Sequence, residues 1–309
     1  WPIPNIGNGD WLGLYYSSTS PHDVVRFNIN LLDPSRFTLI TDMLSYCPIN
    51  RDELTPAEDF RWTSTDQTKI HGWLYMAENP NGKAIVTIHG GPTWHSEDAL
   101  DPKIQYFCSL GYNVLDPNYR GSTGYGVDFR ELIKKEGWGG LEKEDVQTGI
   151  EQMIEFGIAF PNKVGVYGTS YGGYMSWLAI TQFPTDIVAA AAPICGMTDL
   201  VVDYETTRPD LRPYSEEMLG GSPTEIPEKY QERSPINYVQ NVRGRLLIVQ
   251  GLNDPNVTKA NVAEVEKRLE ENKIMYDKLV FDDEGHGIIR EKNVKTLLIR
   301  LAEFFDNAL

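Results

Sequence analysis

A short apolar strand pattern at residues 164–167 leads directly into the motif G-x-S-x-G at residues 168–172, and a helical pattern follows. This order constrains the fold strongly, because a tight turn from a parallel strand into a helix exposes a serine above the edge of a sheet. Gly168 and Gly172 stand where a side chain would have no room, and Ser170 is expected in a strained conformation with Oγ projecting from the turn. The segment predicts a nucleophilic serine. A chain with 27 glycines can form the motif by accident, so the prediction depends on partner residues.

The candidate base is His286. A serine hydroxyl is a poor nucleophile near neutral pH, and it needs a base within hydrogen-bond distance that a carboxylate orients. In the chain order Ser, Asp, His that accompanies this kind of turn, the base comes last, and His286 is the one histidine after Ser170. It follows the apolar run 278–281 and has a glycine on either side, which lets its loop swing the imidazole over the sheet. A surface histidine in an acidic loop is the alternative interpretation.

The candidate carboxylate is Asp254, which follows the buried-strand pattern at residues 245–251. A carboxylate at the end of this strand would lie near the serine and the histidine at one edge of the sheet. The alternative is an Asx turn before a proline, where aspartate is common for local reasons. Asp282 and Asp283 are weaker rivals because they lie so close to His286 in the sequence.

Donors for the oxyanion of a tetrahedral intermediate are expected after the strand pattern at residues 84–88. The sequence His-Gly-Gly-Pro follows at residues 89–92 and lets backbone amides approach a ligand closely. The amides of Gly91 and Tyr171 are the expected donors, whereas Pro92 has no N–H. The alternative is a simple turn that ends a strand.

Composition argues against several classes of function. A net charge of −16 argues against nucleic acid, whose phosphates need a basic surface. No apolar run is long enough for a membrane helix, and no charged and apolar leader is present, so no membrane partner is expected. Three cysteines, Cys47, Cys108 and Cys195, suggest no disulfide framework, and no C-x-x-C spacing suggests a metal. We expect no cofactor and a cytoplasmic location. The chain begins at Trp1 rather than at methionine, which is typical of a processed or trimmed chain.

A chain of 309 residues can bury one large core and a small appendage. From about residue 60, strand patterns alternate with helical patterns, which predicts an α/β protein with a mostly parallel sheet, helices on both faces and ligands beyond the carboxyl ends of the strands. Eight strands are expected, at residues 60–65, 69–76, 84–88, 112–115, 164–167, 187–192, 246–249 and 278–281. Five helices are expected, at residues 102–110, 140–156, 172–182, 259–272 and 293–307.

Residues 196–244 interrupt this alternation and are rich in proline, tyrosine and charge. Short helical pieces are expected at residues 198–204 and 215–219. The segment is expected to supply part of a substrate pocket, and a solvated excursion is the alternative. The candidate lining residues are Tyr204, Arg208 and Tyr238.

Residues 1–47 also stand outside the alternating pattern. Apolar and polar residues alternate there as in three short antiparallel strands, at residues 13–17, 23–29 and 36–40. A three-stranded sheet is only marginally stable by itself, so it must dock on the rest of the chain, on a partner chain or on a missing domain. The expected organisation is an N-terminal β segment at residues 1–47 and a catalytic domain at residues 48–309.

Over residues 60–309 the chain resembles the prolyl oligopeptidase family of serine hydrolases, and most closely its acylaminoacyl-peptidase-like branch. The resemblance rests on the residues and motifs above and on the run NYRGSTGYG at residues 118–126, with Thr169 where tryptophan is more usual. It implies an α/β-hydrolase fold with an eight-stranded, mostly parallel sheet. It also implies a catalytic triad of Ser170, Asp254 and His286, with the amides of Gly91 and Tyr171 as the oxyanion hole.

The chain departs from the family pattern in two places. Members that use a tyrosine hydroxyl in the oxyanion hole have it where this chain has His89, so two backbone amides are expected to suffice. Full-length members carry a β-propeller over the active site, whereas residues 1–47 look like the last blade of one. We therefore expect an accessible site and self-association through the N-terminal strands.

The leading functional hypothesis is a serine-type peptidase that cleaves short peptides, in particular acylated ones, through an acyl-enzyme. One alternative is a carboxylesterase that acts on small esters and has little peptidase activity. A remote alternative is a non-catalytic binding module that keeps the fold. Parallel assays on esters and peptide anilides distinguish the first two, and loss of both activities would indicate the third.

Overall fold

The computed structural model of the chain describes residues 2–7, 9–28, 37–184 and 186–309. Its main body is built on an eight-stranded sheet with the order β12-β11-β10-β9-β7-β8-β6-β5. The strands are β5 (Ala57–Thr63), β6 (Lys69–Tyr75), β7 (Ala84–Ile88), β8 (Asn113–Asn118), β9 (Val164–Thr169), β10 (Ala190–Ile194), β11 (Arg245–Gly251) and β12 (Asp277–Phe281). The pairs from β12 to β8 are parallel, whereas β6 runs antiparallel to both of its neighbours.

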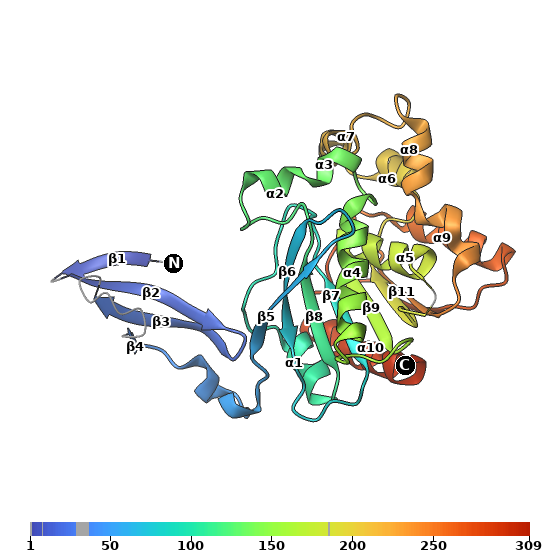
Figure 1. Cartoon of the computed structure of the whole chain (residues 1–309). Coiled ribbons are helices and arrows are strands. Elements are labelled where there is room, and N and C mark those ends of the chain that lie inside the picture. Colours follow the sequence, from blue (N-terminus) through green and yellow to red (C-terminus); the bar gives the residue numbers. More distant parts are fainter. Residues whose placement is uncertain (1, 8, 29–36, 185) are drawn as a thin grey trace.

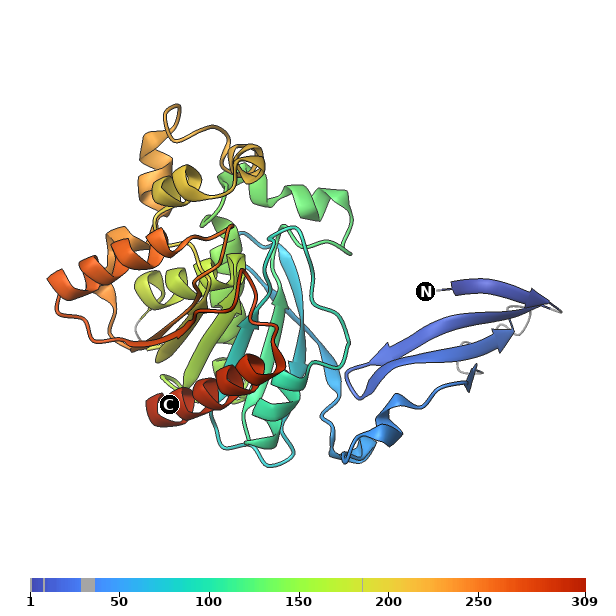
Figure 2. The same cartoon turned by 180° about the vertical axis from the view of Figure 1, so that it is seen from behind.

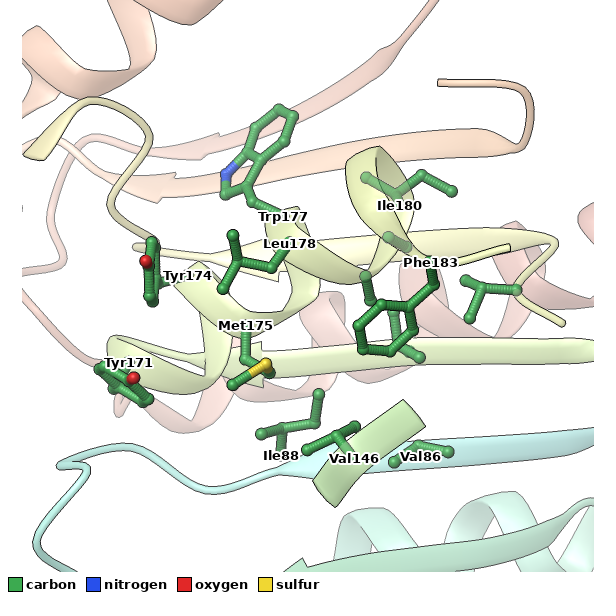
Figure 3. Packing of buried hydrophobic residues seen from close by; sticks show 14 of the residues in the cluster. Val86, Ile88, Val146, Tyr171, Tyr174, Met175, Trp177, Leu178, Ile180 and Phe183 are labelled. Carbon is green, nitrogen blue, oxygen red and sulfur yellow. The ribbon is translucent and has the colours of Figure 1, made fainter. Parts of the chain in front are cut away.

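The side chains of each buried strand belong alternately to two apolar layers, one on each face of the sheet, because successive side chains of a strand point to opposite faces. In β7, Val86 and Ile88 belong to one layer and Ile85 belongs to the other. The first layer is covered by α4 (Leu141–Glu155), α5 (Tyr171–Gln182) and α9 (Lys259–Glu271). The second is covered by α1 (Pro102–Ser109) and α10 (Glu291–Ala308). Figure 3 shows Val86 and Ile88 below Met175 of α5 in the first layer.

Shorter helices gather at one end of the sheet, as Figure 1 shows. They are α2 (Val127–Glu131), α3 (Ile133–Glu136), α6 (Leu200–Thr206), α7 (Arg212–Leu219) and α8 (Pro227–Arg233). Three of them come from the excursion at residues 196–244. That excursion therefore packs over the sheet end instead of extending into solvent, and residues such as Leu200, Leu219 and Tyr230 are buried in the main core.

All eight expected strands and all five expected helices are present, with shifted ends. The expected strand at 187–192 was placed too early: residues 187–189 are buried, but the ladder of β10 begins with Ala190 opposite Gly165. Helices α2, α3 and α8 were not expected, because each has seven residues or fewer and is too short to show helical periodicity.

The N-terminal segment forms an antiparallel sheet of four strands instead of the expected three. The strands are β1 (Pro2–Gly7), β2 (Asp10–Ser17), β3 (Ser20–Asn28) and β4 (Phe37–Leu39). The additional strand β1 contains two prolines, which argue against a central strand but are tolerated at a sheet edge. Ile29 and Arg36, which belong to the expected second and third strands, lie outside the described residues.

The N-terminal sheet lies to one side of the main body, next to β5 (Figures 1 and 2). Two short 3₁₀ helices, η1 (Met43–Tyr46) and η2 (Arg51–Glu53), lead from it to the main body. The turn between β2 and β3 makes several of the direct contacts. The Ser18 amide donates to Asp98 (2.6 Å), and Ser18 Oγ accepts from the Ala57 amide (2.8 Å). The Ser18 carbonyl accepts from Gln105 Nε2 (3.0 Å), so the contact is polar.

Candidate active site

Ser170 lies between the end of β9 and the first turn of α5, with a backbone φ of 63°. Positive φ is rare for a residue with a side chain, and close packing of the turn imposes it here. A Cβ on Gly168 would lie 2.4 Å from the Ile88 carbonyl oxygen, and a Cβ on Gly172 would lie 1.9 Å from the same atom. The turn therefore presses against the end of β7, and only glycine fits at both positions.

Ser170, His286 and Asp254 form one continuous hydrogen-bonded chain. The Nε2 atom of His286 lies 2.8 Å from Ser170 Oγ, and its Nδ1 atom lies 2.8 Å from Asp254 Oδ2. The three residues follow β9, β11 and β12, so the parallel strands bring together side chains that are up to 116 positions apart. The Asp254 carboxylate is fully buried, and the His286 side chain is 25% exposed.

Asp254 also forms the Asx turn that its sequence context predicted. Its second oxygen, Oδ1, accepts hydrogen bonds from the amides of Asn256 (2.8 Å) and Val257 (3.0 Å). The two interpretations of Asp254 are therefore compatible, because one oxygen holds the loop and the other holds the imidazole. Asp283, one of the rival carboxylates, instead accepts from Asn293 Nδ2 (2.8 Å).

Gly91 and Tyr171, whose amides are the expected donors, both line the cavity that contains Ser170 and His286. Neither amide donates a backbone hydrogen bond within the described part of the chain. Tyr171 is the first residue of α5, where N–H groups have no partner inside the helix. Gly91 has a φ of 119°, and a Cβ there would lie 2.7 Å from the Thr93 amide nitrogen. Both donors are thus free to meet an oxygen near Ser170.

The His89 side chain is engaged in contacts other than donation to an oxyanion. Its Nε2 atom lies 2.9 Å from Ser122 Oγ, and its ring stacks on Tyr119 with 4.3 Å between centroids. Burial lowers the pKa of His89 to about 4, so the imidazole is neutral at pH 7. His89 therefore lies outside the lining of the cavity beside Ser170.

Glu142 is a buried carboxyl group directly behind Tyr171, and sequence patterns gave no sign of it. Its Oε1 atom accepts from the Tyr171 hydroxyl (2.6 Å) and from the Gly139 amide. Its Oε2 atom has no partner among the described residues. Burial raises the pKa of Glu142 to about 7. The group joins the residue after Ser170 to the loop that carries Trp138, which also lines the cavity.

The cavity beside Ser170 has a volume of about 190 Å³. Its walls come from the turns after β7, β9, β11 and β12, from the loop before α4, and from the excursion with α6 and α7. The lining residues are Gly91, Trp138, Ser170, Tyr171, Met197, Asp203, Thr207, Leu211, Tyr214, Ser215, Asn256, Val257 and His286. A larger cavity of about 670 Å³ lies beneath residues 94–104, and neither Ser170 nor His286 lines it.

The three pocket residues expected from the sequence, Tyr204, Arg208 and Tyr238, are not in this lining. Asp203 and Thr207 line the cavity instead, because residues four apart share a face of a helix and their immediate successors turn away by about 100°. The Tyr204 hydroxyl donates a hydrogen bond to the Glu216 carboxylate of α7, and the Arg208 side chain is exposed. The excursion therefore lines this cavity through Asp203 and Thr207 rather than through the three expected residues.

No cluster of three or more histidine, cysteine, aspartate or glutamate side chains suited to a metal occurs in the described ranges. Within the same ranges, no helix has the length and apolar character needed to cross a membrane.

The sequence profile of the prolyl oligopeptidase family matches residues 99–309. The dipeptidyl aminopeptidase BIII of Pseudoxanthomonas mexicana is 29% identical over 92% of this chain and 42% of its own length. The acylamino-acid-releasing enzyme of Arabidopsis thaliana is 30% identical over 73% of this chain and 30% of its own length. The chain thus spans less than half the length of these relatives.

Among solved structures, a puromycin-hydrolyzing peptidase of Mycobacterium tuberculosis superposes with a TM-score of 0.87 at 29% identity, over 97% of this chain and 46% of that one. This likeness, with the strand order above, confirms the expected α/β-hydrolase fold. The family match covers more than half of the residues and includes Ser170, Asp254 and His286. The chain belongs to the prolyl oligopeptidase family.

Proposed function

We propose that the chain carries a serine peptidase activity that cleaves short peptides, in particular acylated ones, through an acyl-enzyme. The observation that carries this proposal is the unbroken hydrogen-bonded chain from Ser170 through His286 to Asp254, with two free amides beside the serine. The names of the relatives denote aminopeptidases and acylamino-acid-releasing enzymes, whose common chemistry is attack on an amide carbonyl.

In the proposed acylation step, Ser170 Oγ attacks the substrate carbonyl while His286 Nε2 takes the hydroxyl proton. Asp254 accepts a hydrogen bond from Nδ1, so it fixes the imidazole tautomer and stabilises the imidazolium. The carbonyl oxygen gains negative charge as the tetrahedral intermediate forms, and the amides of Gly91 and Tyr171 donate to it. Collapse breaks the C–N bond, and His286 returns the proton to the leaving amine.

In the second step, water attacks the ester that links the acyl group to Ser170. His286 removes a proton from this water and later gives it to Ser170 Oγ. The carboxylic acid product leaves, and the hydroxyl is restored. The same acyl-enzyme forms from small esters, so esterase activity is expected beside peptidase activity.

The test is covalent labelling of the chain with an organophosphonate, together with turnover of acyl-peptide anilides and p-nitrophenyl esters. Ser170→Ala should abolish labelling and lower turnover by about four to six orders of magnitude. Ser176→Ala is a matched control, because Ser176 is buried on α5 and bonds to the Gly172 carbonyl. Labelling that survives in Ser170→Ala would refute the assignment. Ester turnover without anilide turnover would favour the carboxylesterase alternative.

We also propose a cytoplasmic location. Cys47, Cys108 and Cys195 are free thiols, and Cys47 is exposed. Reducing compartments keep such thiols free. Fractionation of the source cells tests this location directly.

A further inference from the structure

We propose that the cavity beside Ser170 selects a cationic side chain, lysine or arginine, on the residue whose carbonyl is attacked, and that Asp203 recognises this cation. The inference rests on the proposed function, because it names the substrate class of the same site. It concerns a contact with the substrate, so Asp203 is a specificity residue and takes no part in bond making or breaking.

Asp203 is a buried carboxyl group without a cationic partner. It lies on α6, is 6% exposed and lines the cavity together with Ser170. Its Oδ1 atom accepts from Asn261 Nδ2 at 3.2 Å, and its Oδ2 atom makes no hydrogen bond within the described part of the chain. No lysine or arginine of the described residues forms an ion pair with it. A buried carboxylate in this state is costly unless a partner supplies positive charge.

The other walls of the cavity suit both the charged end and the methylene stem of a lysine or arginine side chain. Trp138 and Tyr214 meet edge to face with 5.8 Å between ring centroids, and both rings line the cavity. Aromatic faces attract ammonium and guanidinium groups. Met197 and Val257 supply apolar surface for the methylene stem.

A second acceptor lies in the same lining. Asn256 follows Asp254 in the loop after β11, and its Oδ1 atom is buried without a hydrogen-bond partner among the described residues. Lysine and arginine carry several N–H donors and no acceptor, so a cation that bonds to Asp203 has donors left for a second acceptor. The volume of about 190 Å³ is small for a whole peptide and suits one side chain.

Long-range charge acts in the same direction. The net charge of −16 gives the molecule a field that attracts cationic substrates. The groups that face Asp203 are Asn261 on α9, Asp199 at the start of α6 and Asp254, and none of them is cationic.

The charge of Asp203 makes the selectivity depend on pH. Burial, with smaller contributions from Asp254 and Asp199, raises the pKa of Asp203 to about 7. The carboxyl group is protonated below that pH and charged above it. The preference for a cation should therefore grow as pH rises through about 7. Ionisation of His286 affects the kcat/KM of every substrate equally, so it cancels in the ratio of kcat/KM for two substrates.

The experiment compares kcat/KM for acetyl-arginine p-nitroanilide and acetyl-citrulline p-nitroanilide, which differ in charge and hardly in shape. At pH 8 the arginine substrate should be favoured by about 10- to 100-fold, the range that one charge-assisted hydrogen bond supports. At pH 6 the ratio should be several-fold smaller. Asp203→Asn should reduce the ratio at pH 8 at least tenfold and abolish its change with pH. Asp210→Asn removes the same charge at an exposed site and should leave the ratio unchanged.

Organophosphonate labelling of Ser170 verifies that each variant is folded and active. A wild-type ratio near one, or below one, would overturn the inference and leave the proposed function standing if both substrates are cleaved. A high ratio that persists in Asp203→Asn would also overturn it, because another group would then recognise the cation. If neither anilide is cleaved while other acyl-peptide anilides are, the inference fails and the proposed function stands; if no acyl-peptide anilide is cleaved, the proposed peptidase function fails as well.

Discussion

The two sheets of this chain are held together in different ways. In the eight-stranded sheet both faces lie under helices, and strand residues such as Val86, Val114 and Val166 have no exposed surface. In the four-stranded sheet, Val25 is the one buried apolar side chain among the residues whose burial is described. The hydrophobic effect, which scales with apolar area removed from water, therefore stabilises the first sheet far more than the second.

Polar contacts replace apolar ones in the N-terminal sheet. Asp23 is completely buried, and its Oδ1 atom accepts from Thr41 Oγ1 (2.7 Å) and from the Met43 amide (2.9 Å). These bonds connect β3 to the segment after β4. The hydrogen bonds of Ser18 connect the turn between β2 and β3 to the main body. A typical hydrogen bond adds only about 1 kcal/mol to stability, so a sheet built this way depends on its neighbours.

The largest difference between the two regions is expected for matched glycine substitutions. Gly172→Ala places a Cβ 1.9 Å from the Ile88 carbonyl oxygen, which is a backbone atom, so no flexible side chain can move aside to relieve the clash. It should cost more than about 4 kcal/mol and abolish organophosphonate labelling. Gly7→Ala meets no atom within 4 Å and strains only a φ of 99°, so about 1–2 kcal/mol is expected. Urea unfolding measures both, and similar losses would contradict this contrast.

Cavity-forming substitutions should show the next largest difference. Trp177 of α5 is 1% exposed and lies in the main core (Figure 3). Trp177→Ala should lower the unfolding free energy by about 3–5 kcal/mol. Val25→Ala in the N-terminal sheet should cost about 1–2 kcal/mol. A larger loss for Val25→Ala would show that the small sheet has a core of its own.

The same contrast explains which parts of the fold the sequence predicts. The main sheet was predictable because its strands are continuous apolar runs and its long helices show a clear period, as in residues 246–249 and 259–272. Strand β1 was missed because proline at two positions opposes strand formation everywhere except at an edge, and a sequence does not show which strand is an edge.

The candidate site divides in a similar way. Ser170, Asp254 and His286 were predictable because each follows a strand in a loop with its own local signature. Glu142 and Asp203 were not, since their role depends on which face of a helix meets a cavity and on distant partners such as Tyr171 and Asn261. A charged residue in a helix is usually solvated, so burial of these two carboxyl groups appears only in three dimensions.

Carboxyl groups of the two regions should respond to pH with opposite sign. The pKa of Glu142 is about 7 in the folded chain and ordinarily 4.5, so the folded state binds its proton more tightly. The contribution of Glu142 to stability is therefore complete below about pH 4.5 and is lost as pH rises to about 7, an effect of about 3 kcal/mol. Glu142→Gln keeps an acceptor for Tyr171 and cannot ionise. Relative to the wild type, it should be more stable at pH 8 than at pH 5.

The matched variant in the N-terminal sheet is Asp10→Asn. The hydrogen bond from Arg26 lowers the pKa of Asp10, so its contribution is present above its ordinary pKa and is lost as pH falls through the lowered value. Its effect should therefore be constant between pH 5 and pH 8. Urea unfolding midpoints at pH 5 and pH 8 measure both effects. If the difference in midpoint between Glu142→Gln and the wild type is the same at the two pH values, Glu142 does not titrate between them.

The smallest effect on the hydrolase is expected from removal of the N-terminal sheet. Few hydrogen bonds join the two parts, among them those of Ser18 and a bond from Tyr16 to Glu97 (2.7 Å). A chain that starts at Thr55 should keep its labelling by organophosphonate and lose about 1–2 kcal/mol of unfolding free energy, less than the sum of these bonds because water hydrates the partners that remain.

Self-association should change much more than stability on this truncation. Strands β1 and β4 are the edges of the small sheet, and apolar side chains are exposed on or next to them. Examples are Ile6 (50%), Leu39 (39%) and Ile40 (56%). Unpaired edges with apolar surface pair with other chains, so we propose that the intact chain forms oligomers through this sheet and that the truncated chain is a monomer. Light scattering over a concentration series measures the molar mass of the intact chain and of the truncated chain. If both chains are monomers with equal stability, the proposal is refuted and the N-terminal sheet is a passive extension.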